Sequence, residues 1–539
     1  MQNVSHLISL YCHRSHKRTG PLDDIVNFLI TIGSPALAAY SLQITHLNKY
    51  WITSALLDID YPNAGHMASV LSAFHHIPIQ IEYRPPFLHS LVVLPDNDKF
   101  WSQLAAANSS RRWSIPLVMS YVLVIFSLFL TTADSISNRP GDIGYSIAAI
   151  WTFLLPLIIG WLYVGCEPEP SHLRRALAAA NREVWVSTEE RGHPVTMTCP
   201  KAMEFARASG VDAKPDDVDP EADNLDVEAG GVDLARNDEL KPVPVFNYSR
   251  AFVTPMNADV VLRLLKNAAA NAKREIPVGN SVGPGGIPVW VPNDKEGNIS
   301  HHNRIGTIAE VVEYCSRVLR LPKRNSGYVA QLEIQPADSE VLDTTYPLID
   351  QGLVVPSRWA PGIWTRVVVA SILALALQWG TAGAAVYIHY IAPPPGLGCR
   401  AFSFLLYGLA GTLSFLLLLA SSILAHMSRP LPGQVPTRSW STTCQNAGAT
   451  IFRWAGKCVA IVSAIGIVLA CFFQVTEAFD NCYCTSTTFD KGRHFVVFTG
   501  ITFDPDYKLI FLWITGQVVA FVVAILFGCS MYAGLPPRR

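Results

Sequence analysis

The sequence predicts an all-α membrane protein, a polytopic helical bundle of six or seven transmembrane helices with a partly disordered, α-rich cytosolic insertion. Composition is the first observation behind this prediction, because half of the 539 residues are hydrophobic and only 15% are charged. Soluble domains carry about 25% charged residues. The second observation is that the apolar residues form long blocks and do not recur at the spacing of amphipathic helices or strands. A bilayer accounts for such blocks better than several soluble cores do.

Six long segments of the chain contain no Asp, Glu, Lys or Arg. A helix needs about 20 apolar residues to cross about 30 Å of hydrocarbon, where charged side chains are strongly disfavoured. The six segments are residues 113–133, 143–166, 367–391, 401–427, 458–476 and 509–532. They predict three pairs of transmembrane helices, at residues 113–166, 362–427 and 458–532.

A seventh candidate lies at residues 22–48, which are free of charged residues from Ile25 to Asn48 but are interrupted by Gly33-Ser34-Pro35. Proline removes a backbone donor and kinks a helix, which lipid tolerates only where neighbouring groups satisfy the freed carbonyl. Two interpretations stay open, a transmembrane helix and a re-entrant helix. A crossing would place the basic tail at residues 1–21 on the non-cytosolic side, and this conflict with the positive-inside bias favours re-entrance.

Basic residues near the segment ends predict the orientation of the bundle. When the loops are assigned alternately to two sides, one side carries thirteen basic residues and the other carries five. The richer side is cytosolic by the positive-inside bias. The cytosolic parts are then a partly interfacial region at 49–112, the insertion at 167–361, the loop at 428–457 and the tail at 533–539. We expect a protein of the secretory pathway or the plasma membrane, with a cytosolic C-terminus.

Three cysteines fall in the two loops that this orientation places outside. Disulfides persist on the oxidising face of a membrane and not in the cytosol. Cys399 is therefore a candidate for a disulfide with Cys482 or Cys484, which would join the two loops. Free thiols in unrelated loops remain the alternative.

The insertion at 167–361 differs in composition from the membrane segments. Residues 212–240 contain eleven acidic and two basic residues up to Glu239, a balance that predicts a disordered linker. A calcium site there is the alternative, but the EF-hand spacing is missing. The stretches 258–273 and 305–319 each have one apolar face and predict amphipathic helices. The insertion is the expected binding region for a cytosolic protein partner, and the lipid bilayer is the other expected partner.

The sequence contains no recognisable catalytic, cofactor-binding or metal-binding motif. It has neither a GxSxG elbow nor an HExxH helix, and no complete zinc ligand set. We therefore assign no cofactor and predict no enzymatic activity. A net charge of −1 argues against nucleic-acid binding.

Polar residues inside a bilayer are costly and are therefore functional candidates. The predicted membrane segments and their ends carry five of them: Gln378, His389, Gln474, Glu477 and Gln517. Only Glu477 is normally charged, and it stands near Asp480 at a helix end, where a solvated acidic mouth is favoured over a buried proton relay.

Several short runs carry a resemblance to known proteins. GPLDDI at 20–25 precedes GSPALAAYSL at 33–42, and WGTAGAA at 379–385 precedes GLGCR at 396–400. Together they resemble a group of uncharacterised fungal multi-pass integral membrane proteins over most of the chain. The resemblance implies a membrane protein and adds no activity or site.

Three functions are compatible with these features. A structural or signalling membrane protein with a partner-binding cytosolic region fits the missing motifs and the acidic linker. A small-molecule or ion transporter or channel would use the polar positions, but the sequence shows neither internal repeats nor charges near helix midpoints. A membrane-embedded enzyme is the third hypothesis.

Overall fold

The structure is a computed structural model that describes part of the chain. The described residues are 21–73, 79–81, 87–108, 147–164, 176, 179–181, 184–188, 194–196, 232–234, 251–279, 290–293, 298–319, 357–391, 396–429, 440–476, 478–479 and 507–533. The predicted membrane segment at 113–133 lies outside them. Of the acidic linker at 212–240 only β4 (Val232–Leu234) is described, as a strand where disorder was predicted. The rest of that linker also lies outside.

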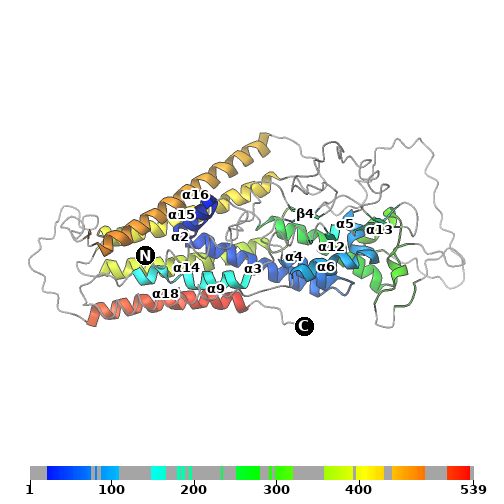
Figure 1. Cartoon of the computed structure of the whole chain (residues 1–539), viewed down its shortest axis with the longest axis horizontal. Coiled ribbons are helices and arrows are strands. Elements are labelled where there is room, and N and C mark those ends of the chain that lie inside the picture. Colours follow the sequence, from blue (N-terminus) through cyan, green and yellow to red (C-terminus); the bar gives the residue numbers. More distant parts are fainter. Residues whose placement is uncertain are drawn as a thin grey trace, which may run out of the picture.

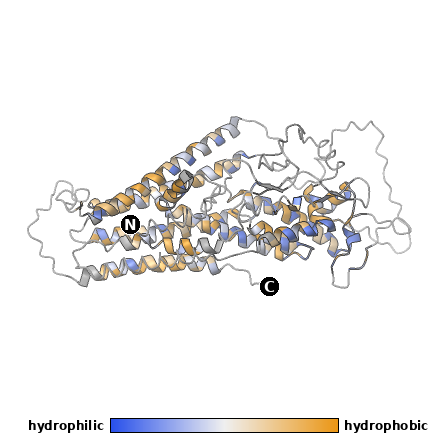
Figure 2. Cartoon of the chain, viewed as in Figure 1, coloured by the Kyte–Doolittle hydropathy of each residue, from blue (hydrophilic) through white to orange (hydrophobic). Residues whose placement is uncertain are grey.

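Four helices of the described part are long and apolar enough to cross a membrane. They are α14 (Ile363–Ile391), α15 (Cys399–Ser428), α16 (Trp440–Val475) and α18 (Tyr507–Ala533). They lie together in one half of the molecule (Figure 1), and Figure 2 shows that they are mostly hydrophobic. These helices coincide with the last four predicted segments and indicate a membrane protein. The predicted total of six or seven crossings is not reached within the described residues, which offer four, or five with a bent pair.

Helix α16 begins well before the segment predicted at 458–476. Its N-terminal half contains Arg453 and Lys457, which a search for charge-free stretches excludes. Small and hydroxylated residues hold this part against α15. The Ser414 hydroxyl donates to the Gly456 carbonyl at 2.9 Å, and the Ser421 hydroxyl donates to the Ala449 carbonyl. Helix α16 therefore extends beyond its purely apolar part because α15 packs along that extension and donates these hydrogen bonds to it.

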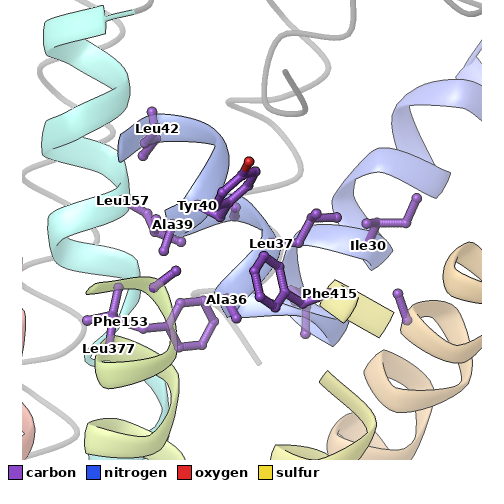
Figure 3. Close-up of a cluster of buried hydrophobic side chains, with 14 of the residues drawn as sticks. Ile30, Ala36, Leu37, Ala39, Tyr40, Leu42, Phe153, Leu157, Leu377 and Phe415 are labelled. Carbon is purple, nitrogen blue, oxygen red and sulfur yellow. The ribbon is translucent and has the colours of Figure 1, made fainter. Parts of the chain in front are cut away.

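The bent pair consists of α2 (Pro21–Gly33) and α3 (Pro35–Leu57), which meet at Ser34 with an angle of 98°. A straight helix cannot pass this point, because Pro35 has no N–H to continue the hydrogen-bond ladder. The two arms form a V in Figure 3, which has Leu37 near its vertex and Ile30 on the α2 arm. This geometry is that of a broken span or a re-entrant segment, the two alternatives left by the sequence.

The predicted segment at 143–166 is also interrupted. It contains α8 (Ile147–Trp151) and α9 (Leu154–Val164), with a turn at Thr152 and Phe153 between them. Its apolar helical part, Ala149–Gly160, is shorter than a full crossing. Helix α9 packs against α3 and α18, so the interrupted segment belongs to the bundle.

The other half of the molecule is a globular module with its own core. Its helices are α4 (Ala64–Ala73), α5 (Phe87–Val93), α6 (Asp98–Asn108), α12 (Val253–Lys273) and α13 (Ile308–Ser316), with the 3₁₀ turns η2 (Pro95–Asn97) and η4 (His301–Arg304). Helices α12 and α13 agree with the two predicted amphipathic helices. Thr307 starts α13 with a capping box, in which its hydroxyl and the Glu310 carboxylate each accept from the other residue's N–H.

Two short antiparallel pairings accompany these helices. Strand β1 (Ile79–Ile81) pairs with β4, with Gln80 opposite Asp233, and β2 (Trp185–Val186) pairs with β3 (Val195–Thr196). Figure 2 shows hydrophobic and hydrophilic residues mixed along the module helices, as expected for helices with one buried face.

The core of the module draws on two distant parts of the sequence. Phe100 and Trp101, which precede the first predicted membrane pair, are buried with Val261, Leu265 and Tyr314 of the insertion. Residues 49–112 and the insertion therefore fold together. The last turns of α3 also enter this core, whereas its first turns belong to the core of the bundle.

Candidate functional site

The helix break at Ser34 lies deep inside the bundle, beside polar side chains of neighbouring helices. Ser34 is fully buried, and so are the neighbouring residues Ala36 and Leu37. A break in a helix frees backbone groups that lipid cannot satisfy. The break can therefore persist only if the surrounding helices supply donors and acceptors.

Three side-chain contacts to α14 and α15 meet this requirement. The Tyr407 hydroxyl donates to the Ile32 carbonyl at 2.7 Å, and the Ser34 hydroxyl donates to the Gly411 carbonyl at 2.8 Å. The Ala36 N–H, one of the first donors of α3, donates to Oε1 of Gln378 at 3.0 Å. We call these contacts, with the Gln378 amide, the apex network.

The Gln378 side-chain amide donates hydrogen bonds as well as accepting one. Its Nε2 donates to the Gly408 carbonyl at 2.7 Å and to the Thr412 hydroxyl at 3.0 Å. A Cβ atom at Gly411 would lie 3.0 Å from this amide, so the absence of a side chain there lets Gln378 reach the α15 backbone. Gln378 thereby joins α3, α14 and α15.

Replacing Gln378 with leucine should destabilise the bundle by about 1–2 kcal/mol, because hydrogen bonds between membrane helices contribute up to about that amount. The Ala36 N–H would lose its partner. Thermal unfolding of the purified protein in detergent would measure the change. Thr515→Val is the matched control, because the Thr515 hydroxyl is exposed and donates to the Phe511 carbonyl of its own helix. Equal stability of the two variants would contradict the proposed role of Gln378.

Helix α3 is enclosed on all sides through its first half. Residues from Ala36 to His46 are buried, including the polar Ser41, Gln43 and Thr45. Figure 3 shows Leu37 and Tyr40 among side chains of the neighbouring helices, and the Tyr40 ring lies 5.3 Å from that of Phe415. The helix is thus the central element of the bundle and not a lipid-facing one.

The other predicted polar positions lie at separate places. The His389 ring stacks on Phe404 at 4.8 Å. Nε2 of Gln517 donates to the Thr152 hydroxyl at 3.3 Å, at the turn between α8 and α9. Gln474 is buried near the end of α16, and Glu477 lies outside the described residues. The structure therefore places Gln378 and Gln517 at different helix interfaces, α3 with α14 and α15 for the first and α18 with the α8–α9 turn for the second.

The candidate disulfide can be examined at one of its ends. Cys399, the first residue of α15, is disulfide-bonded. Cys482 and Cys484 lie outside the described residues. The cysteines that the structure describes as free thiols are Cys315, Cys444, Cys458, Cys471 and Cys529. The partner of Cys399 is therefore outside the described part, and its identity stays a prediction.

The module contains a buried charged group that the sequence did not single out. The Arg304 side chain is 3% exposed and pairs with Asp98, with Nη2 2.8 Å from Oδ1 and Nη1 3.0 Å from Oδ2. Its Nε donates to the Val93 carbonyl at 2.9 Å. Asn63 also donates to Asp98. These contacts tie η4 to α6 and to the end of α5.

The titratable groups beside Arg304 are not poised for chemistry at neutral pH. Burial raises the pKa of Tyr61 to about 12, although Arg304 lowers it in part. Burial also raises the pKa of the Cys315 thiol, which therefore stays protonated and is a weak nucleophile. The chemistry of this cluster favours a structural role. Across the residues with described positions, no group of three or more His, Cys, Asp or Glu side chains could hold a metal ion.

Sequence reasoning missed the residues that complete the apex network and the Arg304 cluster. Tyr407 and Thr412 are uncharged and lie within an apolar segment, so no composition signal separates them from their neighbours. The Gly33-Ser34-Pro35 break was visible, but its partners on α14 and α15 are more than 340 residues away in the sequence, as shown by the separations of 342 and 377 residues in two of the contacts.

Comparison with known proteins adds no family to these observations. No family model matches the chain, and no curated protein and no solved structure shows significant similarity to it.

Proposed function

We propose that this chain is a multi-pass integral membrane protein with a structural or signalling role, and that its globular module is a cytosolic region that binds a protein partner. Helix α3 is the observation that carries the proposal. Leu37 and Ile44 of this helix lie in the bundle core, and Ile52 and Leu56 lie in the module core. One unbroken helix thus connects the apex network to the module.

This connection supports a role in which a movement of α3 is transmitted between the bundle and the module. It supports independent action of the two parts less well. Helices are stiff, so a displacement of α3 at the apex must move the module helices that pack on its other end. The Asn48 side chain further fixes α3 by donating to the Ala251 carbonyl, just before α12, at 3.1 Å. A membrane-bound adaptor or signalling protein needs this kind of linkage.

The proposal includes the orientation that the basic residues predict. The N-terminal end of α16, the C-terminal end of α18 and the module lie toward the same end of the molecule in Figure 1. Cys444 is exposed near that end of α16. We expect a membrane-impermeant maleimide to label Cys444 only after the membrane has been permeabilised, with Cys444→Ser as the control that identifies the labelled site. Equal labelling in intact cells would contradict the cytosolic assignment.

A proximity-labelling enzyme fused after Arg539 tests the partner-binding role. The full-length protein should mark a reproducible set of proteins, and Arg304→Met, which we expect to open the module, should reduce that set severalfold. Arg317→Ala is the control, because Arg317, just after α13, is 68% exposed and pairs with Glu313 of that helix. A labelled set that is the same for both variants and for a membrane-anchored enzyme alone would contradict the proposal.

A transporter or channel is the second candidate, and one observation favours it. Two apolar segments of the bundle are broken, α2–α3 at Ser34 and α8–α9 at Thr152, and broken helices often surround substrate sites in transporters. The Gln378 amide, however, is occupied by helix contacts at both ends. The Gln517 side chain is 5% exposed, and its Oε1 accepts no hydrogen bond from any described residue. Substrate flux in proteoliposomes that Gln517→Leu abolishes would therefore support transport over the structural role.

For the third hypothesis, a membrane-embedded enzyme, the Cys315 thiol is a poor candidate nucleophile. The Cys315 thiol is fully buried and protonated at neutral pH, as its raised pKa requires. The described residues provide no candidate metal cluster either.

A further inference from the structure

Arg366, in the first turns of α14, is a buried cation at the junction between the bundle and the module. The residue is 9% exposed. Its guanidinium carbon lies 4.5 Å from the centroid of the Trp51 ring, which belongs to the part of α3 near the module. Its Nε and Nη2 atoms donate no hydrogen bond to any residue that the structure describes. A buried guanidinium with two unused donors is strongly unfavourable unless an anion accepts from it.

The neighbouring carboxylate does not fill this role. Asp259 of α12 is near enough to act on Arg366 electrostatically. Its carboxylate, however, pairs with Arg263 of the same helix, with Nη2 2.7 Å from Oδ2. The Asp259 carboxylate is thus already paired, and Arg366 forms no ion pair of its own with a described residue, so no direct contact neutralises its positive charge.

Two helix starts converge on the same place and add to that charge. Helix α14 begins three residues before Arg366, and α12 begins at Val253 with no side-chain cap. The Phe252 ring, just before α12, lies 6.1 Å from that of Trp364. Helix N-termini carry partial positive charge and uncapped N–H groups, which favour anions.

We propose that Arg366 binds a phosphate-bearing anion at this junction, with Nε and Nη2 as paired donors and the Trp51 ring on one face of the guanidinium. Arginine matches phosphate oxygens with two parallel hydrogen bonds, and it keeps its positive charge in buried sites. The phosphate can belong to a phospholipid headgroup or to a soluble phosphate compound. The place of the site, at the end of an apolar helix and beside the half-exposed Trp364, is the level at which headgroups lie.

The test uses the full-length protein in detergent, with its thermal unfolding followed during titration with phosphatidic acid, phosphatidylcholine or inorganic phosphate. Phosphatidic acid should stabilise the wild-type protein with saturation, and phosphatidylcholine should not. Stabilisation by inorganic phosphate at similar concentrations would identify a soluble ligand as the source. In Arg366→Gln the half-saturating concentration should rise about tenfold or more, as expected for the loss of charge-assisted hydrogen bonds.

Three further variants keep the test decisive. Lys266→Gln, the matched control on α12, should leave the half-saturating concentration within about twofold of the wild type, because Lys266 is exposed and is not part of the Arg366–Asp259–Arg263 group. Arg366→Lys retains the charge but loses the paired geometry, so its affinity should be intermediate. Asp259→Asn removes the competing carboxylate and should tighten binding. The proposal is overturned if Arg366→Gln binds phosphatidic acid as tightly as the wild type, if Asp259→Asn abolishes binding, or if neither phosphate probe stabilises the wild-type protein.

Discussion

Replacing Gly33 with alanine should destabilise the bundle by about 3 kcal/mol or more, which is the upper end of the cost of overpacking a well-packed core. A Cβ atom at this position would lie 1.8 Å from the Ala460 carbonyl oxygen and 3.0 Å from the Ala464 N atom. Both atoms belong to the α16 backbone, which cannot turn aside as a flexible side chain could. Helix α2 would have to separate from α16, and the apex network at Ser34 would separate with it. Thermal unfolding in detergent would measure this loss.

Gly466→Ala provides a control on α16 itself, at a position outside the contact with α2. Gly466 lies on α16, and no atom lies within 4 Å of the position that its Cβ would take. Alanine is favoured over glycine in a helix by up to about 1 kcal/mol, so this variant should be as stable as the wild type or slightly more stable. Equal stability of Gly33→Ala and Gly466→Ala would contradict the close packing of α2 against α16 at Gly33.

The long apolar helices could be predicted because the bilayer imposes a length and a composition on each helix separately. The segment predicted at 367–391 falls within α14, and that at 401–427 falls within α15. The criterion fails where a helix is longer than the hydrocarbon layer, as in α16, which begins at Trp440. The criterion also cannot decide whether an interrupted segment crosses the membrane or returns to the same side. The segment with the 98° bend at Ser34 was therefore left with both alternatives.

The shared core of the module could not be predicted, because an amphipathic face does not identify the face that covers it. Val261 and Leu265 of α12 were recognised as one apolar face, but nothing in the sequence joins them to Phe100 and Trp101. The same limit applies to the candidate sites. Gln378 was singled out for its polarity, whereas its role depends on Ala36, which is 342 residues away in the sequence. Arg366 is one of the thirteen basic residues near the segment ends on the richer side, and its burial against Trp51 sets it apart.

Replacing Arg304 with methionine should lower the free energy of opening the module by about 3 kcal/mol. This is the lower end of the cost of breaking a buried ion pair by removing one partner. The lower end applies because Asp98 is 38% exposed and can be solvated after the change. Methionine retains most of the apolar stem, so the loss reflects the contacts of the guanidinium with Asp98 and the Val93 carbonyl.

Cys315 offers a direct measure of this opening, because its thiol is free and fully buried in the module core. Its rate of alkylation in the native protein, followed by mass spectrometry, reports the fraction of molecules with an open module. A loss of about 3 kcal/mol corresponds to a rate increase of roughly 100-fold. Arg317→Ala should change the rate by less than about fivefold, since the pair of Arg317 with Glu313 is exposed and such pairs contribute about 0–1 kcal/mol. Similar rates for the two variants would show that the Arg304 contacts do not hold η4 to α6. The module is built from residues that precede and residues that follow the first predicted membrane pair in the sequence. Its assignment as one cooperative unit rests on that connection.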